Sequence, residues 1–321
     1  MKHPLNLTVL LILMFLTAQL LGLLIIREYV NIEASHETGS TVNNENVFRQ
    51  IGFEPPVVEN ESLSFIFILI SVLVGTGFIL LIIKFRKGNL WKLWYFFAVL
   101  FALLFAFNPF VFKLFALLGV ASLLPPYATL LLISLGLSLF KILKPNVVVH
   151  NLTEMLIYGG IAAMLVSVID LFSAIALLVL ISGYDAYAVW KSKHMVALAE
   201  FQKTTNLFAG LYFPYNPGDA GKKAAGKGKP GAKPKATSKA PAAAPAAILG
   251  GGDIAFPLLF AGAVMKTTGS LLAPFIIAIA TTAALSMLLM KADKGKFYPA
   301  MPFLSLGCFV GFFIWLLISL I

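Results

Sequence analysis

The sequence predicts an all-α integral membrane protein with nine transmembrane helices, and three observations support this fold class. Of its 321 residues, 60% are hydrophobic and only 12% are charged, a composition outside the range of soluble globular domains. The apolar residues gather in runs of about 20, the helix length that crosses about 30 Å of hydrocarbon. Finally, basic residues alternate between successive loops, as expected when they collect on the cytoplasmic side.

Nine apolar runs are long enough to cross a bilayer. The first follows Lys2, exceeds the apolar stretch of about 7 to 15 residues in a signal peptide, and has no typical cleavage site after it, so we expect a retained span. Residues 108–126 contain the interruptions NPF and LPPY, and a short additional segment could lie there. The nine expected spans are 5–26, 63–83, 91–112, 124–143, 147–168, 170–190, 248–265, 270–290 and 300–321.

The distribution of basic residues predicts the orientation of these spans. With a cytoplasmic N-terminus, the cytoplasmic loops hold all of the 24 basic residues except Arg27, Arg49, Lys113 and Lys266. An additional span within residues 108–126 would break this alternation. The segment from residue 27 to residue 62 carries seven glutamates against two arginines, which suits an external loop. We therefore expect nine spans, a cytoplasmic N-terminus and a C-terminus outside.

A long loop divides the chain into three parts. Residues 1–190 hold six spans, 191–247 form a cytoplasmic loop rich in Lys, Ala, Gly and Pro, and 248–321 hold three spans. From residue 216 the loop has no large apolar side chain to bury, so we expect it to be largely disordered. It holds much of the net charge of +10. Because this excess lies in one cytoplasmic loop, it indicates contact with the lipid bilayer, and we expect no nucleic-acid partner.

Several chemistries lack the residues that they need. Cys308 is the single cysteine and has no histidine near it in the sequence, so neither an intrachain disulfide nor a thiolate nucleophile is expected. The four histidines are scattered, and no H-E-x-x-H motif is present to hold zinc. No serine occupies a G-x-S-x-G setting. We expect no metal and no cofactor.

Carboxylates within the spans are the remaining candidates, because ionisable groups are costly in hydrocarbon. Asp185 and Asp253 each lie five residues from the cytoplasmic end of consecutive antiparallel spans, about 7 to 8 Å deep. Two carboxylates that face each other at one level cannot both ionise easily, so they share one proton. Aspartic proteases use such a pair of carboxylates. Glu154 lies just inside the fifth span and could instead make a structural contact, for example with Lys144.

Glycine and proline surround these aspartates. Gly250, Gly251 and Gly252 precede Asp253 and let another group approach the backbone closely. Pro257 removes the amide that would bond the carbonyl of Asp253, so we expect a loosened helix around the acid. The segment YPAMPFL, residues 298–304, enters the membrane from the same side with two more prolines. Such irregularity is tolerated only where protein or a water-filled cavity satisfies the backbone.

At these residues the chain resembles the presenilin and signal peptide peptidase family of intramembrane aspartyl proteases. Tyr184 and Asp185 match its Y-D motif, and Gly250 to Asp253 match its G-x-G-D motif. Pro299, Ala300 and Met301 are similar to its P-A-L motif, with Met in place of Leu. The three motifs lie in order on the sixth, seventh and ninth spans. YDAYAVWKSKHM looks like the archaeal presenilin-like branch, which suggests the cell membrane of a prokaryote.

The resemblance implies a presenilin-like bundle of nine helices that hydrolyses peptide bonds within transmembrane helices of substrate proteins. It implies that Asp185 and Asp253 are catalytic. Substrate contacts would come from Tyr184, which an aromatic belt at the interface explains equally well, and from the other motif residues: Gly250, Gly251, Gly252, Pro299, Ala300 and Met301. A substrate strand could add to an exposed edge beside these residues. The resemblance does not say whether accessory subunits are needed.

Two other function classes remain open at this point. An ion channel or proton-coupled transporter would also place carboxylates in a wet cavity. However, a transporter needs a pathway to both faces, and no acid lies in the outer half of the sixth, seventh or ninth span. A non-catalytic scaffold would leave the paired aspartates unexplained.

Overall fold

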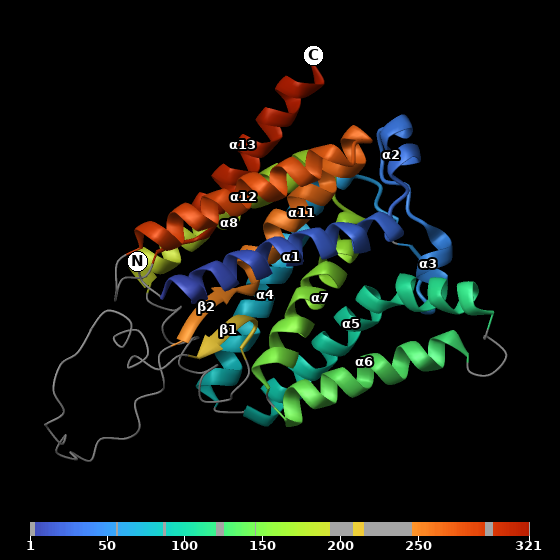
Figure 1. Cartoon of the computed structure of the whole chain (residues 1–321), viewed down its shortest axis with the longest axis horizontal. Helices are drawn as coiled ribbons and strands as arrows, with labels where there is room; N and C mark the ends of the chain where they lie inside the picture. The colour runs from blue at the N-terminus through green and yellow to red at the C-terminus, as the bar shows by residue number, and fades with distance from the viewer. Residues whose placement is uncertain are drawn as a thin grey trace, which may run out of the picture.

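The computed structural model describes residues 4–55, 57–85, 88–119, 125–144, 146–192, 208–214, 246–292 and 298–320. Across these residues the chain is mostly helical, with one small two-stranded sheet (Figure 1). Eight helices in this part of the chain are long and apolar enough to cross a membrane. The protein is therefore a multi-pass integral membrane protein, as the sequence predicts.

The spanning helices lie close to the apolar runs of the sequence. The third is longer than expected, because its helix continues through Asn108 and Pro109 as far as Leu118. The interrupted stretch that follows Phe107 therefore extends this span, at least through the described residues. The eight helices are α1 (Leu5–Tyr29), α4 (Ser64–Lys84), α5 (Gly88–Leu118), α6 (Pro126–Leu143), α7 (Val147–Val166), α8 (Leu171–Tyr187), α12 (Leu272–Lys291) and α13 (Met301–Ser319).

Helix α11 (Gly251–Thr268) occupies the place of the expected seventh span but is not among these eight. It carries Asp253 and Lys266, which lower its apolar character. Its surroundings explain why such a helix is stable in the bundle. It contacts α1, α7, α8, α12 and α13, and its residues from Pro257 to Lys266 are all buried. A helix enclosed by protein does not need the uniformly apolar surface that lipid requires.

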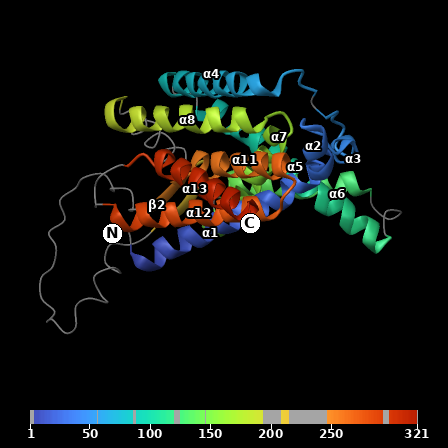
Figure 2. The ribbon, with the colours of Figure 1, turned by 90° about the horizontal axis from the view of Figure 1, so that it is seen from above.

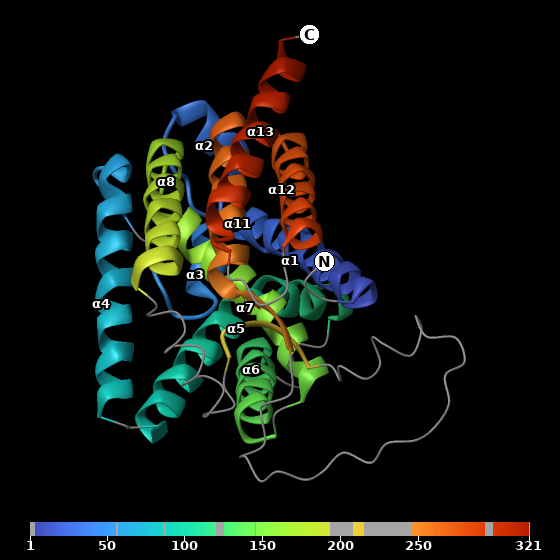
Figure 3. The ribbon, with the colours of Figure 1, turned by 90° about the vertical axis from the view of Figure 1, so that its left-hand side faces the viewer.

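The remaining helices are arranged around α11. Helix α4 lies at one edge of the molecule beside α8, and α13, α12 and α1 follow on the other side (Figures 2 and 3). Helices α5 and α6 pack against α7 below this group. Only 6% of the most apolar part of α4 is buried, the lowest share among the eight helices, so α4 is the one most open to lipid.

Close helix packing depends on small residues, as is common where helices meet in membranes. Gly160 of α7 lies against the backbone of Ala102 on α5, where an added Cβ would overlap the carbonyl. A Cβ added to Gly159 would lie 3.2 Å from the Cα of Gly22 on α1. These contacts bring α1 and α5 against neighbouring faces of α7, and α7 supports the site described below.

The segment between α1 and α4 folds into short helices, α2 (Ile32–Thr38), α3 (Glu45–Arg49) and η1 (Glu61–Leu63). The buried Lys266 at the end of α11 contacts this segment. Its ammonium donates to Thr41 and to the carbonyl of Val166, and it lies 3.5 Å from Glu61. A buried ammonium needs such partners because an unpaired charge is costly there.

The sheet corrects two expectations from the sequence. Residues 246–250 form strand β2, paired antiparallel with β1 (Gly210–Pro214), so the helix begins at Gly251 and not at Ile248. Ala246 and Ala247, expected in the disordered loop, belong to this strand. The alternating burial of β2, with Ala247 and Leu249 covered, is the pattern of a strand. The rest of the predicted disordered stretch, residues 216–245, lies outside the described residues.

Candidate active site

Asp185 lies in the last turn of α8, just before the helix continues into the π-helical turn η2 (Ala188–Ser192). Its side chain is buried, with a relative exposure of 6%. The backbone N–H of Met301 donates to its Oδ2 atom at 3.1 Å, and the backbone of Ala300 also hydrogen-bonds the carboxyl group. Two residues of the expected P-A-M motif therefore contact this aspartate directly.

The start of α13 explains why Asp185 is held there. The first amides of a helix have no partner within the helix. Here Phe303 and Leu304 donate to the carbonyl of Ala300, and Pro302 has no N–H to donate. Met301 and the N-cap residue Ala300 are thus the donors left at this end, and Asp185 accepts from both. The positive end of the α13 dipole also favours a negative charge at this position.

Asp253 occupies a related position at the start of α11. It lies in the first turn of the helix, is half-buried, and accepts a hydrogen bond from the backbone of Gly250, the N-cap residue. A carboxylate at the third helical position that reaches back to the N-cap amide is one half of a capping box. Both aspartates therefore lie at helix N-termini, although Asp185 belongs to a different helix from the one it caps.

The structure brings the two aspartates together. Helices α8 and α11 are in contact, and Asp185 lies close enough to Asp253 for their charges to interact. The donors at the two helix N-termini offset part of the repulsion between two like charges. The arrangement can hold one carboxylate ionised and the other protonated beside the same reacting group.

The three glycines before Asp253 serve different purposes. An added Cβ on Gly251 would overlap the hydroxyl of Tyr158 and lie 2.6 Å from its Cε1 and Cζ atoms. On Gly250 it would lie 3.2 Å from Oδ2 of Asp253, whereas on Gly252 it would meet nothing closer than 3.5 Å. The expectation of a loosened helix around Asp253 is wrong, since α11 is continuous from Gly251 through Pro257. Only the strand-to-helix junction before the aspartate is irregular.

Tyr184 does not hydrogen-bond the neighbouring aspartate among the described residues. Its side chain is 44% exposed, which suits a residue at the membrane interface. The tyrosine that contacts the glycine motif is Tyr158 of α7, which the sequence did not single out. Its spacing of four residues from Glu154 places both on one helix face and was the available signal.

Glu154 is fully buried, and its partner differs from the one suggested by the sequence. Its Oε1 atom lies 2.6 Å from the ammonium of Lys141, which is buried on α6, while Lys144 is exposed. Tyr95 donates to the same oxygen at 2.8 Å, and Tyr158 donates to Oε2. Helix α6 turns Lys141 toward the protein, because the buried positions of this helix, Leu130, Ser134, Ser138 and Lys141, recur every three or four residues.

The sheet beside the aspartates has one edge covered by α7; on the other, called the open edge, the outward backbone groups of Ile248 have no hydrogen-bond partner among the described residues. Asn151 of α7 exchanges two hydrogen bonds with Tyr212, accepting from its N–H at 2.9 Å and donating to its carbonyl at 3.0 Å. His150 bonds the carbonyl of Gly210 at 2.9 Å. The groups of Tyr212 therefore point away from β2, so in its partner Ile248 the N–H and C=O point away from β1.

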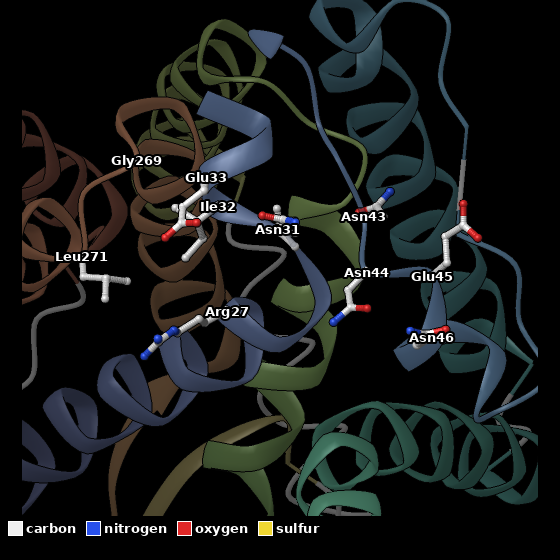
Figure 4. A pocket seen from close by; sticks show the side chains of 11 residues that line it. Arg27, Asn31, Ile32, Glu33, Asn43, Asn44, Glu45, Asn46, Gly269 and Leu271 are labelled. Atoms are coloured by element: carbon white, nitrogen blue, oxygen red, sulfur yellow. The ribbon is translucent and has the colours of Figure 1, made fainter. Parts of the chain in front are cut away.

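A large polar pocket lies elsewhere and is not a candidate for the same chemistry. It has a volume of about 630 Å³ and is lined by Arg27, four asparagines, Glu33, Glu45 and Gly269, among others (Figure 4). Gly269 caps the C-terminal end of α11 and Asp253 lies in its first turn, so about 24 Å separates them along the helix at 1.5 Å per residue. The pocket is open and neither aspartate lines it, so we place the candidate active site at Asp185 and Asp253 and not in this pocket.

Comparison with known proteins gives a family for this arrangement. A sequence model described as "Signal-peptide peptidase, presenilin aspartyl protease" matches residues 41–321. A solved structure of a presenilin family intramembrane aspartate protease is similar with a TM-score of 0.57 and 17% identity, over 96% of this chain and 97% of that chain. The same kind of protein in a second crystal form gives a TM-score of 0.55 and 18% identity, over 95% of each chain. Among curated proteins, no match is found.

Proposed function

Because the chain belongs to the signal-peptide peptidase and presenilin family of aspartyl proteases, we propose that Asp185 and Asp253 are its two catalytic carboxylates. The protein is an intramembrane aspartyl protease. The observation that supports the assignment of the pair is their meeting at the N-termini of α13 and α11, where they interact electrostatically. Among the described residues, no other two acids on different spans show an electrostatic interaction with each other.

The reaction follows from what two such carboxylates can do. The ionised one accepts a proton from water as the water oxygen attacks the scissile carbonyl. The protonated one donates to the carbonyl oxygen, giving a tetrahedral intermediate. When the C–N bond breaks, a proton passes to the leaving nitrogen. Sharing of one proton by the pair keeps both forms available at the same time.

The proposed topology has nine spans, with α11 counted beside the eight apolar helices. The N-terminus is cytoplasmic and the C-terminus outside, as the distribution of basic residues indicates. The aspartates then lie near the cytoplasmic ends of their spans, Asp185 in the last turn of α8 and Asp253 in the first turn of α11. The likeness of the Tyr184 segment to archaeal relatives supports the cell membrane of a prokaryote as the location.

A substrate helix must unwind before water can reach its carbonyl, and its freed backbone groups then need partners. The open edge of β2 meets this need. The N–H and C=O of Ile248 face away from β1, and Asp253 follows five residues later at the start of α11. Addition of an extended substrate segment to this edge, as in other cases of strand addition, would place a peptide bond beside the aspartates. Gly250 and Pro299 to Met301 border the same place.

An apolar cavity suits the part of the substrate that remains helical. It has a volume of about 460 Å³ and is lined by residues of α4, α5 and α7, among them Phe67, Gly75, Trp94 and Leu165. Because α4 has few buried residues, a substrate helix can reach this cavity from the bilayer. We infer that transmembrane substrate proteins dock here before the segment near Ile248 becomes extended.

Membership of a protease family removes the reason for preferring a channel or a proton-coupled transporter. The carboxylates that suggested transport are explained by hydrolysis. Neither is a scaffold role required, since the two aspartates have a chemical task.

The direct test uses purified protein in detergent with a peptide that contains one apolar span, and weighs the products by mass spectrometry. The expected result is cleavage within the cytoplasmic half of the span. A second arm presents the same labelled span in both orientations in vesicles. Cuts confined to the outer half would contradict the proposed depth of Asp185 and Asp253, and absence of any product from several such peptides would contradict the proposed activity.

A further inference from the structure

A buried polar cluster lies against the junction between β2 and α11, on the side opposite the open strand edge. It consists of Tyr95 of α5, Lys141 of α6, and Glu154 and Tyr158 of α7. Glu154 is 1% exposed and Lys141 is 2% exposed. The glutamate accepts from both tyrosine hydroxyls and from the lysine, which also donates to Thr153 at 2.9 Å. Every charged group of the cluster is thus hydrogen-bonded.

The cluster contacts residues that flank the two strands, near Asp253. The hydroxyl end of Tyr158 lies over the Cα of Gly251, leaving no room for a side chain there. The hydroxyl of Tyr95 lies 3.3 Å from the carbonyl of Phe208, just before β1. The amide of Gly251 donates to the carbonyl of Ala209, which follows Phe208, at 3.2 Å. Glu154 is therefore linked through one tyrosine to the end of β2 and through the other to the start of β1.

Stability alone does not account for this arrangement. Replacing a buried ion pair with apolar residues of similar volume is often neutral or stabilising, so a buried Lys and Glu are not needed to hold three helices together. What a carboxylate with two fixed oxygens does provide is a defined position for two hydroxyl groups. Catalysis depends on such positions, because a displacement of about 1 Å at a reacting group can reduce the rate about 100-fold.

We propose, on the basis of the catalytic pair proposed above, that Glu154 and Tyr158 are positioning residues for Asp253. Glu154 holds the Tyr158 hydroxyl against Gly251, and this contact sets where β2 ends and where α11 begins. Asp253 stands two residues after Gly251 and takes its location from that junction. Lys141 pairs with Glu154 at 2.6 Å and compensates its charge beside the two tyrosines.

The chain supplies a matched control for the test. Tyr29 of α1 is also a fully buried tyrosine, and its hydroxyl donates to the carbonyl of Phe105 at 2.7 Å. It lies at the end of α1 near α3, remote from the aspartates. Tyr158→Phe and Tyr29→Phe each remove one buried, hydrogen-bonded hydroxyl and keep the ring, so a general loss of stability should be similar in both.

The first experiment compares these two variants by steady-state cleavage of a single-span peptide and by hydrogen exchange. For Tyr158→Phe we expect kcat to fall about tenfold with KM within about twofold of wild type, since the reacting group moves while substrate binding remains. We also expect amides within residues 246–256 to exchange about threefold faster or more, with residues 272–291 unchanged. Tyr29→Phe should show neither change. Equal kcat or equal exchange of residues 246–256 in the two variants overturns the positioning role.

The exchange measurement separates this inference from the proposed function. If the wild-type protein cleaves no peptide, the catalytic assignment fails, but faster exchange at residues 246–256 in Tyr158→Phe still decides whether the tyrosine fixes the junction. A second comparison tests Glu154 itself. Glu154→Gln leaves Lys141 as an unpaired buried charge and should lose thermal stability and activity together. Glu154→Gln combined with Lys141→Met keeps an oxygen for the tyrosines and removes the charge.

That double variant should recover kcat to within about threefold of wild type, because the amide still orients the Tyr158 hydroxyl. Adding Tyr158→Phe to it should again lower kcat. A folded double variant with activity no better than Glu154→Gln, or a triple variant as active as the double, would show that the cluster does not act through Tyr158.

Discussion

Met301 donates its backbone N–H to the Oδ2 atom of Asp185 across 3.1 Å, and this hydrogen bond joins the end of α8 to the start of α13. The contact uses only the backbone of Met301, while its side chain is buried with an exposure of 3%. The same residue thus has two separable roles. Its amide holds a carboxyl group, and its side chain fills buried space at the start of α13.

This separation predicts different effects for two substitutions of Met301. Met301→Leu nearly conserves volume and keeps the amide, so cleavage should remain within about twofold of wild type. Met301→Ala leaves a cavity and should destabilise the protein by about 2 to 4 kcal/mol, with reduced cleavage. Thermal unfolding and cleavage assays check both. A leucine variant as damaged as the alanine variant would mean that the sulfur atom has a role of its own.

The glycines before Asp253 should respond unequally to alanine. Gly251→Ala forces a Cβ into Tyr158 and should cost about 1 to 3 kcal/mol of stability. Gly252→Ala meets nothing closer than 3.5 Å and lies inside a helix, where alanine is preferred by roughly 0.5 to 1 kcal/mol. The midpoints of thermal unfolding should therefore move in opposite directions. Equal midpoints for the two variants would exclude the close packing of Tyr158 on Gly251.

A pair of glycines on α4 tests the docking cavity. Gly75 lines the cavity and Gly77 does not, and an added Cβ meets no atom within 4 Å at either position. Gly75→Leu should therefore fold normally but fill space that a substrate helix needs, raising KM about tenfold with kcat little changed. Gly77→Leu is the control and should leave both constants near wild type. If the two variants behave alike in steady-state kinetics, substrate does not dock in this cavity.

The open edge of β2 can be blocked without disturbing its pairing with β1. Ile248→Pro removes an N–H that points away from β1, and proline is tolerated on the outer side of an edge strand. We expect kcat/KM to fall by about tenfold, the equivalent of one or two hydrogen bonds at about 1 kcal/mol each, with thermal stability little changed. Leu249→Pro is the comparison, because it removes a ladder bond to Leu211 and should lower stability as well. Wild-type cleavage by Ile248→Pro would argue against strand addition.

Much of the fold follows from the length and apolarity of the helices. The bounds of α4, α6, α7, α12 and α13 lie within a few residues of the expected spans, since a bilayer imposes one length on each helix. The strand at residues 246–250 could not be predicted in this way. A short apolar run before glycines suits either a strand or a helix, and only pairing with residues 210–214, far away in the sequence, decides between them.

The candidate site shows the same division. Asp185 and Asp253 could be found because isolated carboxylates stand out in apolar spans. The pairing of Glu154 with Lys141 could not be chosen over Lys144, because that choice depends on which face of α6 packs against α7. The sequence could not single out Tyr158 for a similar reason. A tyrosine in a membrane helix is common, and its contact with Gly251 exists only in the folded bundle.

The central claim is that Asp185 and Asp253 together perform the hydrolysis. Its most direct test is mass-spectrometric detection of single-span peptide products from three variants: Asp185→Asn, Asp253→Asn and Asp170→Asn. Asp170 is the N-cap of α8, where asparagine caps as well, so its variant controls for loss of a carboxylate on the same helix. We expect wild-type products from Asp170→Asn and none from the other two, with all three folded. Appreciable product from either Asp185→Asn or Asp253→Asn would contradict the account.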